Sequence, residues 1–221
     1  MNNSVGNTAR LLGAGLRALL VLTVLCGVLY PLAVTGVAQA AFGHRANGSE
    51  VEDENGRVVG SSLIGQSYGG DLRRFQGRPA AGLAANTVNT QYELLVSGAT
   101  NKAADSPELL EAVREARTRV LLDNTVPGYT PHPSEIPADA VTSSGSGLDP
   151  DISPAYAKLQ LHRVAQKNGL PVAEVAQLVA DHTRGRTLGF MGEPRVNVLE
   201  LNVALESLAR KERERGAEAR P

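Results

Sequence analysis

The sequence contains no tryptophan and a single cysteine, and each scarcity excludes a class of site. Aromatic residues make up only 4% of the 221 residues, so a stacking platform for bases or sugars is not expected. The lone Cys26 cannot form an intrachain disulfide. It also excludes zinc sites built from four cysteines, or from two cysteines and two histidines.

The chain also has no excess of positive or of negative charge. The 22 lysines and arginines and 23 aspartates and glutamates give a formal charge of −1. Such a chain has no basic field for a phosphate backbone, so nucleic acid is not expected as a partner. The sequence also lacks a phosphate-binding P-loop, a His-Glu-x-x-His motif and a Gly-x-Ser-x-Gly elbow. Neither catalytic residues nor a metal site are therefore expected.

One long uncharged run stands out, from residue 18 to residue 43. About 20 helical residues cross a bilayer core, so this run predicts a transmembrane helix. Arg10 and Arg17 precede it, and no acidic residue does. This bias favours a cytoplasmic N-terminus and an extracytoplasmic soluble domain. The expected organisation is a cytoplasmic segment at 1–17, a transmembrane helix at 18–42, a soluble domain at 43–210 and a charged flexible tail at 211–221.

A cleaved signal peptide is the alternative interpretation of the same run. Ala38-Gln39-Ala40 fits the small-x-small pattern at which such peptides are cleaved. The chain would then be a secreted or membrane-tethered binding protein released at Ala40. The apolar run is longer than the 7–15 residues usual in signal peptides, which favours an uncleaved anchor.

The predicted span carries features that indicate packing against other membrane helices. Tyr30 and Pro31 lie near its middle, and lipid satisfies neither the tyrosine hydroxyl nor the carbonyl that proline leaves unpaired. Gly27, Gly36 and Ala40 are small enough to let another helix approach closely. A tolerated kink in a solitary anchor is the alternative.

The remainder of the chain predicts an α+β domain of helices and short strands. Asn55-Gly56 is a turn signal, and Val58-Val59 starts a short strand. Residues 61–100 are expected to hold loops and short strands, and residues 123–150 a proline-rich loop. Capping residues and apolar spacing predict helices at about 106–122, 153–167, 171–185 and 197–210.

Two loops could hold a ligand, and each has a structural alternative. The Gly/Ser run at residues 143–147 could hold an anion on its backbone N–H groups, or it could be a flexible turn that enters a helix cap. Asp149 and Asp151 could bind a cation, or they could interact with the dipole of the helix that follows. His182 is interpreted as a residue of the apolar helix face and not as a ligand.

Several motifs resemble one known family in the same order along the chain. They are Gly60–Gln66, Phe75–Pro79, Val141–Pro150, Ile152–Pro154, Gln160 with Arg163–Ala165, and Gly192–Leu205. Together they resemble the C subunit of the bacterial high-affinity potassium-transporting P-type ATPase, the Kdp complex. Ala80 and the segment Ser97–Asn101 depart from the family's usual residues.

The resemblance implies a non-catalytic subunit of an ATP-driven potassium importer in the bacterial inner membrane, with a single span. The implied partners are an ATP-hydrolysing P-type subunit and a potassium-channel-like subunit. The implied role is a catalytic chaperone that raises the ATP affinity of the ATP-hydrolysing subunit through a ternary complex. No cofactor would be bound tightly. The implied nucleotide contacts are Ser144, Gly145, Ser146, Gly147 and Gln160.

The charge bias around the predicted span and the ATP-related role implied by the resemblance place the soluble domain in different compartments. ATP is cytoplasmic, whereas Arg10 and Arg17 favour a soluble domain on the outer side. On the outer side the domain would stabilise the assembly or cap the external entrance near the pore. Gln160 would then be a helix residue that bonds a neighbouring loop.

Overall fold

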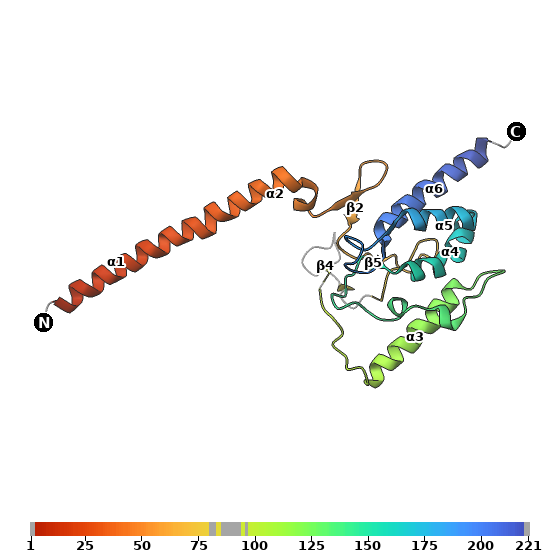
Figure 1. The fold of residues 1–221 in the computed structure, drawn as a ribbon, viewed down its shortest axis with the longest axis horizontal. Coiled ribbons are helices and arrows are strands. Elements are labelled where there is room, and N and C mark those ends of the chain that lie inside the picture. The colour runs from red at the N-terminus through yellow and green to blue at the C-terminus, as the bar shows by residue number, and fades with distance from the viewer. Residues whose placement is uncertain (1–2, 80–82, 85–93, 96, 219–221) are drawn as a thin grey trace. The chain divides into compact units, whose positions relative to one another are not determined.

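The computed structural model describes residues 3–79, 83–84, 94–95 and 97–218. The chain divides into two compact units, residues 1–49 and 50–221, and Figure 1 traces the elements of both. The first unit is one long apolar helical segment, and the second combines helices with short strands. The predicted α+β class is confirmed.

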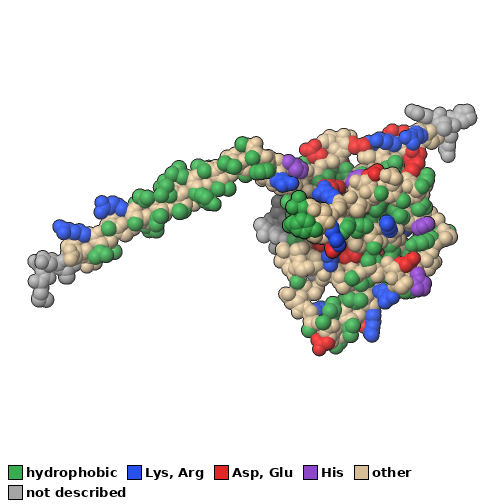
Figure 2. All heavy atoms as spheres, in the orientation of Figure 1, with side chains coloured by type: hydrophobic (Ala, Val, Ile, Leu, Met, Phe, Trp, Pro, Cys, Tyr) green, Lys and Arg blue, Asp and Glu red, His purple; other side chains and the backbone are tan. Residues whose placement is uncertain are grey.

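The N-terminal unit consists of helix α1 (Asn3–Val24), a π-helical turn η1 (Leu25–Leu29) and helix α2 (Tyr30–Ala46). Val5–Ala46 is long and apolar enough to cross a membrane, and Figure 2 shows hydrophobic side chains along its length. At 1.5 Å per residue its 42 residues measure about 63 Å, roughly twice a bilayer core. The helical segment is thus longer than the expected span at 18–42.

Pro31 explains the π-helical turn. Proline has no N–H to donate, and its ring clashes with the carbonyl four residues earlier in a regular α-helix. The helix widens just before it, and the Tyr30 N–H donates to the Leu25 carbonyl five residues back. The helix therefore passes the proline without breaking. A second irregularity lies at Phe42, whose φ and ψ are −141° and 38°.

The second unit begins with an antiparallel hairpin of β1 (Glu50–Glu52) and β2 (Val58–Ser61). Asp53 Oδ1 accepts hydrogen bonds from the Asn55 and Arg57 N–H groups at 2.9 and 3.0 Å, and Gly56 has a φ of 72°. The turn predicted at Asn55-Gly56 and the strand predicted at Val58 are confirmed. A second pair, β3 (Leu83–Ala84) and β4 (Leu94–Leu95), is also antiparallel.

A three-stranded antiparallel sheet holds the C-terminal part together, in the order β5-β7-β6. Its strands are β5 (Asp151–Ile152), β6 (Thr183–Arg184) and β7 (Arg195–Asn197). The helices are α3 (Pro107–Asn124), η2 (Pro133–Glu135), η3 (Ala138–Ala140), α4 (Pro154–Asn168), α5 (Val172–Asp181) and α6 (Val198–Glu218). Helix α4 packs against both α3 and α5, and α5 packs against α6.

The predicted helix caps are confirmed. Ser106 and Ser153 accept from the N–H groups of Leu109 and Tyr156 at 3.2 and 3.0 Å, and Asn197 accepts from that of Glu200 at 3.1 Å. Glu200 is placed to complete a capping box with Asn197, but its carboxylate pairs with Arg184 instead. The predicted apolar stripe of α6 faces the core, with Val198, Leu201 and Leu205 buried.

Two helix ends differ from prediction. Helix α5 ends at Asp181 and not near Gly185, because Thr183 and Arg184 leave the helix to pair with β7. His182 lies at this helix end, half-buried, with Nδ1 2.8 Å from the Leu178 carbonyl. Helix α6 continues through Glu218, so most of the segment expected as a tail from Lys211 is an exposed helix.

Candidate functional site

The 71–79 segment contains the Phe75–Pro79 motif and pairs with no strand in the described sheets. Side-chain amides satisfy its backbone instead. Asn202 of α6 accepts from the Phe75 N–H at 2.8 Å and donates to the Phe75 carbonyl at 2.9 Å. Gln160 of α4 does the same for Gln76, at 2.7 and 3.1 Å. Two neighbouring residues are thus held from two helices by paired hydrogen bonds like those of a sheet.

Arg163 is fully buried and binds several of these elements together. Its guanidinium donates to the Asn124 Oδ1 at 2.9 Å, to the Arg74 carbonyl at 2.9 Å, to the Leu72 carbonyl, and to the Gln160 Oε1 at 2.6 Å. Burial lowers the pKa of Arg163 to about 10, so the group remains protonated at neutral pH. Its charge is dispersed over neutral oxygens, which also orient the Gln160 amide.

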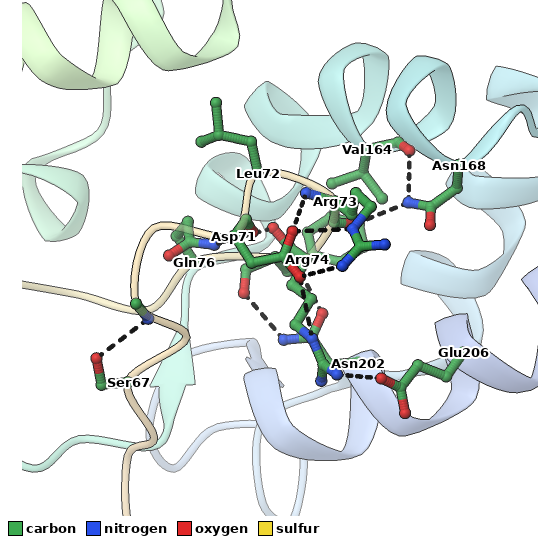
Figure 3. A network of polar contacts seen from close by, with 12 residues as sticks. Ser67, Asp71, Leu72, Arg73, Arg74, Gln76, Val164, Asn168, Asn202 and Glu206 are labelled. Atoms are coloured by element: carbon green, nitrogen blue, oxygen red, sulfur yellow. Dashed lines mark hydrogen bonds and ion pairs between the residues drawn. The ribbon is translucent and has the colours of Figure 1, made fainter.

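The outer side of the same segment carries further polar contacts, which Figure 3 shows. Asn168 donates to the Arg73 carbonyl at 2.7 Å and to the Val164 carbonyl at 2.9 Å. Asp71 forms an ion pair with Arg73 at 3.1 Å, and hydrogen bonds from Arg73 hold the pKa of that carboxyl below its usual value. The segment is therefore fixed from both its buried and its exposed sides.

The Gly/Ser loop lies beside two motifs that are far upstream in the sequence, Gly60–Gln66 and Phe75–Pro79. Gly65 donates to the Leu148 carbonyl at 2.8 Å. A Cβ atom at Gly65 would lie 2.7 Å from the Asp149 carbonyl, so only glycine permits this approach. Arg78 donates to the Asp149 carboxylate at 2.9 Å, and its buried Nε has no hydrogen-bond partner among the described residues.

The cavity between these residues is small. Ser144 and Gly147 line it together with Gly65, Arg78 and Asp149, and its volume is about 20 Å³. That is room for about one water molecule, whereas small-molecule sites usually measure several hundred Å³. A nucleotide could therefore meet this loop only on its outer surface, where Gly145 and Ser146 are exposed.

The structure brings together four of the five predicted nucleotide contacts and separates the fifth. Ser144, Gly145, Ser146 and Gly147 form one loop, in which the Gly147 N–H donates to the Ser144 carbonyl at 3.2 Å. Gln160 is fully buried in α4 and bonds the 71–79 segment. These contacts match the alternative interpretation of Gln160 as a helix residue that bonds a neighbouring loop. Its contact with a nucleotide stays a prediction.

The two aspartates that follow the loop, Asp149 and Asp151, each form an ion pair with an arginine. Asp149 pairs with Arg78, and Asp151 pairs with Arg195 at 3.0 Å. Burial raises the pKa of Asp151, an effect that Arg195 opposes. No cluster of three metal-ligating side chains occurs in the described part of the chain. The acid at the start of α4 is Asp139, which accepts from the Ser153 N–H at 2.7 Å, so the helix-dipole interpretation fits Asp139 better than Asp149 or Asp151.

The predicted helix-packing residues all lie in the N-terminal unit. Gly27 is in the π-helical turn, and Tyr30 and Pro31 begin α2. Gly36 and Ala40 are one turn apart on α2, and nothing lies within 4 Å of a Cβ built at Gly36. The structure therefore leaves space for a neighbouring helix at these positions, and the packing itself stays a prediction.

Sequence reasoning assigned no role to Arg163, Asn202, Asn124 or Arg78. A signal was present in two cases, because Arg163 and Asn202 interrupt faces that otherwise carry apolar residues. A charged or amide side chain at such a position must find partners inside the fold. Their identities depend on loops far away in sequence.

Comparison with known proteins gives one consistent result. The family described as KdpC: K+-transporting ATPase, c chain, matches residues 12–207. A protein of Streptomyces coelicolor named Potassium-transporting ATPase KdpC subunit is 64% identical over 219 residues, covering 94% of this chain and 97% of the relative. Proteins with the same name from Streptomyces avermitilis and Gemmatimonas aurantiaca are 62% and 50% identical, covering 94% and 88% of this chain and 98% and 93% of the relatives.

Proposed function

Because the chain belongs to the KdpC family, the c chains of K+-transporting ATPases, we propose that it is a non-catalytic subunit of a high-affinity potassium importer. In this role it joins an ATP-hydrolysing P-type subunit and a potassium-channel-like subunit in the bacterial inner membrane, and it stabilises their assembly. The secreted binding protein considered as an alternative is not favoured by the family membership.

One observation carries the non-catalytic role. Gln160, Arg163 and Asn202 are fully buried, and their polar atoms are bonded to backbone or to one another. Side chains that are buried and hydrogen-bonded in this way cannot reach a substrate unless the fold opens. They support a rigid scaffold, which suits a subunit that holds others in place.

The proposed orientation follows from charge. Arg10 and Arg17 precede the uncharged part of the helical segment, and basic residues favour the cytoplasmic side. The soluble unit would then lie outside the cytoplasm. In that position it would contact the external faces of its partners.

We propose that Gly36 packs against another helix of the complex, so Gly36→Leu is expected to loosen subunit association. A leucine would block the close approach that a small residue permits. The readout is the amount of partner subunits that co-purifies with the tagged chain in detergent. Ala38→Leu is the matched control, because residue 38 lies about 200° around the helix from residue 36. Equal co-purification of both variants with the wild type would contradict the packing proposal.

ATP contact through the Ser144–Gly147 loop is a second candidate role, in which the chain raises the ATP affinity of its partner. The loop favours it, because Ser144 and Gly147 line the same small cavity as Arg78, and backbone N–H groups and a guanidinium bind phosphate. The Asp149 carboxylate that pairs with Arg78 weighs against it. This role also requires the loop to reach the compartment that contains ATP.

If the loop contacts ATP, Gly145→Val is expected to raise the ATP concentration for half-maximal activity of the complex about tenfold. The valine side chain would hold the phosphate away from the loop N–H groups, and the loss of one hydrogen bond to a charged group has about this effect. A Cβ at Gly145 meets nothing within 4 Å and its φ is not positive, so the fold should tolerate valine. Gly216→Val at an equally open position is the control.

Gln160→Ala complements this variant. It should weaken ATP-dependent activation if Gln160 contributes to the nucleotide contact. Because the variant also loses both hydrogen bonds to Gln76, the comparison is made on preparations that retain equal amounts of the partner subunits. An unchanged ATP dependence in both variants would exclude the ATP role and leave the role in assembly.

The subunit role itself is tested by extracting a C-terminally tagged full-length chain from native membranes with detergent. Mass analysis should find the intact 23.2 kDa chain together with a P-type ATPase and a large polytopic partner. A lone, shortened chain in the soluble fraction would overturn the proposal and indicate cleavage after Ala40.

A further inference from the structure

A tight turn at residues 187–191 carries the most exposed apolar cluster among the described residues of the second unit. Thr187 and Met191 exchange backbone hydrogen bonds at 2.9 and 3.0 Å, which fixes the turn. Within this turn, the side chains of Leu188, Phe190 and Met191 are 80%, 72% and 50% exposed. Three large apolar side chains at neighbouring positions form a patch, whereas single exposed apolar residues need no explanation.

The backbone of this turn is unfavourable for the residue it carries. Leu188 has a φ of 55°, in the left-handed region that glycine and asparagine adopt more readily than leucine. Strained positions of this kind concentrate at functional sites. Since the leucine side chain is exposed, it contributes little to the folding of this chain. A strained, exposed leucine at this position points to a contact outside the chain.

The charges around the turn are paired within the chain. Arg186 pairs with Glu193 at 2.8 Å, and Arg184 pairs with Glu200 at 2.6 Å. An anionic lipid surface would be attracted by unpaired cations, and an interfacial loop usually adds tryptophan or tyrosine. The 187–191 turn has neither feature. A neutral rim around an apolar tip fits an apolar pocket on another protein.

The size of the patch indicates how that protein is held. With roughly 200 Å² for a large side chain, the three exposed fractions leave about 400 Å² available, half of what one partner buries in a stand-alone interface. Such a patch is too small to hold a freely diffusing protein or a second copy of this chain. It suffices for a partner kept close by other contacts, such as those of the membrane helix.

We propose that the 187–191 turn inserts Leu188, Phe190 and Met191 into an apolar pocket on another membrane subunit of the same ATPase complex. This inference rests on the proposed subunit role and names a surface through which it is exercised. Methionine adapts to irregular pockets, and phenylalanine offers a large apolar surface to bury.

Photo-crosslinking in the intact complex tests the contact. A photoreactive phenylalanine analogue replaces Phe190 in the tagged full-length chain, or replaces Leu122, a solitary residue of α3 that is 71% exposed. Irradiated membranes are extracted with detergent, and adducts are identified by mass analysis. We expect an adduct between position 190 and another subunit of the potassium-transporting ATPase, and no such adduct from position 122.

Each other outcome overturns the inference. Adducts of position 190 with lipid, with a second copy of the chain or with an unrelated protein would assign the turn elsewhere. No adduct, in a preparation that still contains the other subunits, would overturn the docking inference and leave the subunit role intact. Absence of the other subunits from the preparation would overturn the subunit role and this inference together.

A double variant, Leu188→Asn with Phe190→Ser, tests the energetic role of the patch. Asparagine tolerates the backbone at position 188, so the melting temperature of the chain should not fall. The fraction of partner subunits retained through detergent purification is expected to fall about tenfold, as for the loss of an interface anchor. Leu122→Ser is the matched control and should retain them. Undiminished retention in the double variant would contradict the proposal.

Discussion

Arg163→Met is expected to lower the free energy of unfolding by about 3–5 kcal/mol, because it removes the donor from several buried acceptors at about 1–3 kcal/mol each. Methionine fills much of the same volume but donates no hydrogen bond. The carbonyls of Leu72 and Arg74, the Asn124 Oδ1 and the Gln160 Oε1 would each lose a donor. Denaturant unfolding of the full-length chain in detergent, followed by circular dichroism, measures the loss.

Arg114→Met is the matched control for this substitution. Arg114 lies on an exposed position of α3, where replacements usually change stability by no more than about 0.5 kcal/mol. If Arg163→Met were as mild as the control, the buried guanidinium would not be the hub that its contacts indicate. The difference between the free energies of unfolding of the two variants separates the effect of losing the buried contacts from the general effect of removing an arginine.

Asn202→Leu should cost about 2–6 kcal/mol, because it leaves two buried backbone groups unpaired at about 1–3 kcal/mol each. The Phe75 N–H and carbonyl both bond to the Asn202 amide, and leucine can replace neither bond. The same unfolding measurement applies. Gln166→Leu, at an exposed position of α4, should have little effect.

Asn202→Asp separates the two hydrogen bonds. A carboxylate still accepts from the Phe75 N–H but places a second oxygen against the Phe75 carbonyl. The variant should therefore be destabilised at neutral pH and recover in part in acid, where a protonated carboxyl can donate. The stability difference between the variant and the wild type is measured at neutral and at acidic pH. If this difference is the same at both pH values, the hydrogen bonds assigned to the Asn202 amide are contradicted.

Local patterns were sufficient to predict the helices and their beginnings. The uncharged run, the Ser-Pro pairs at 106–107 and 153–154, and the stripe that starts at Val198 all depend on residues within a few turns of one another. The end of α5 was predicted wrongly because strand pairing with β7, which lies elsewhere in the sequence, decided it. Helix patterns contain no information about such a partner.

The candidate site shows the same division. The Ser144–Gly147 loop was identified from composition, because glycine and serine mark a turn wherever they cluster. The partners of Gln160 and Asn202 could not be identified in this way, because they lie 84 and 127 residues away in sequence. Local spacing does not specify which distant carbonyl a buried amide will meet.

The amino-acid sequence therefore settled the apolar helix, the order of the helices and the membership of the family, since each depends on short-range order or on motifs. The tertiary structure decided which polar residues are buried and what they hold, and it revealed the exposed apolar turn at 187–191. The physical reason is that burial is a property of packing. The identity of a leucine or an arginine does not specify whether it lies in the core or at the surface. Only the assembled fold determines whether water or protein surrounds it.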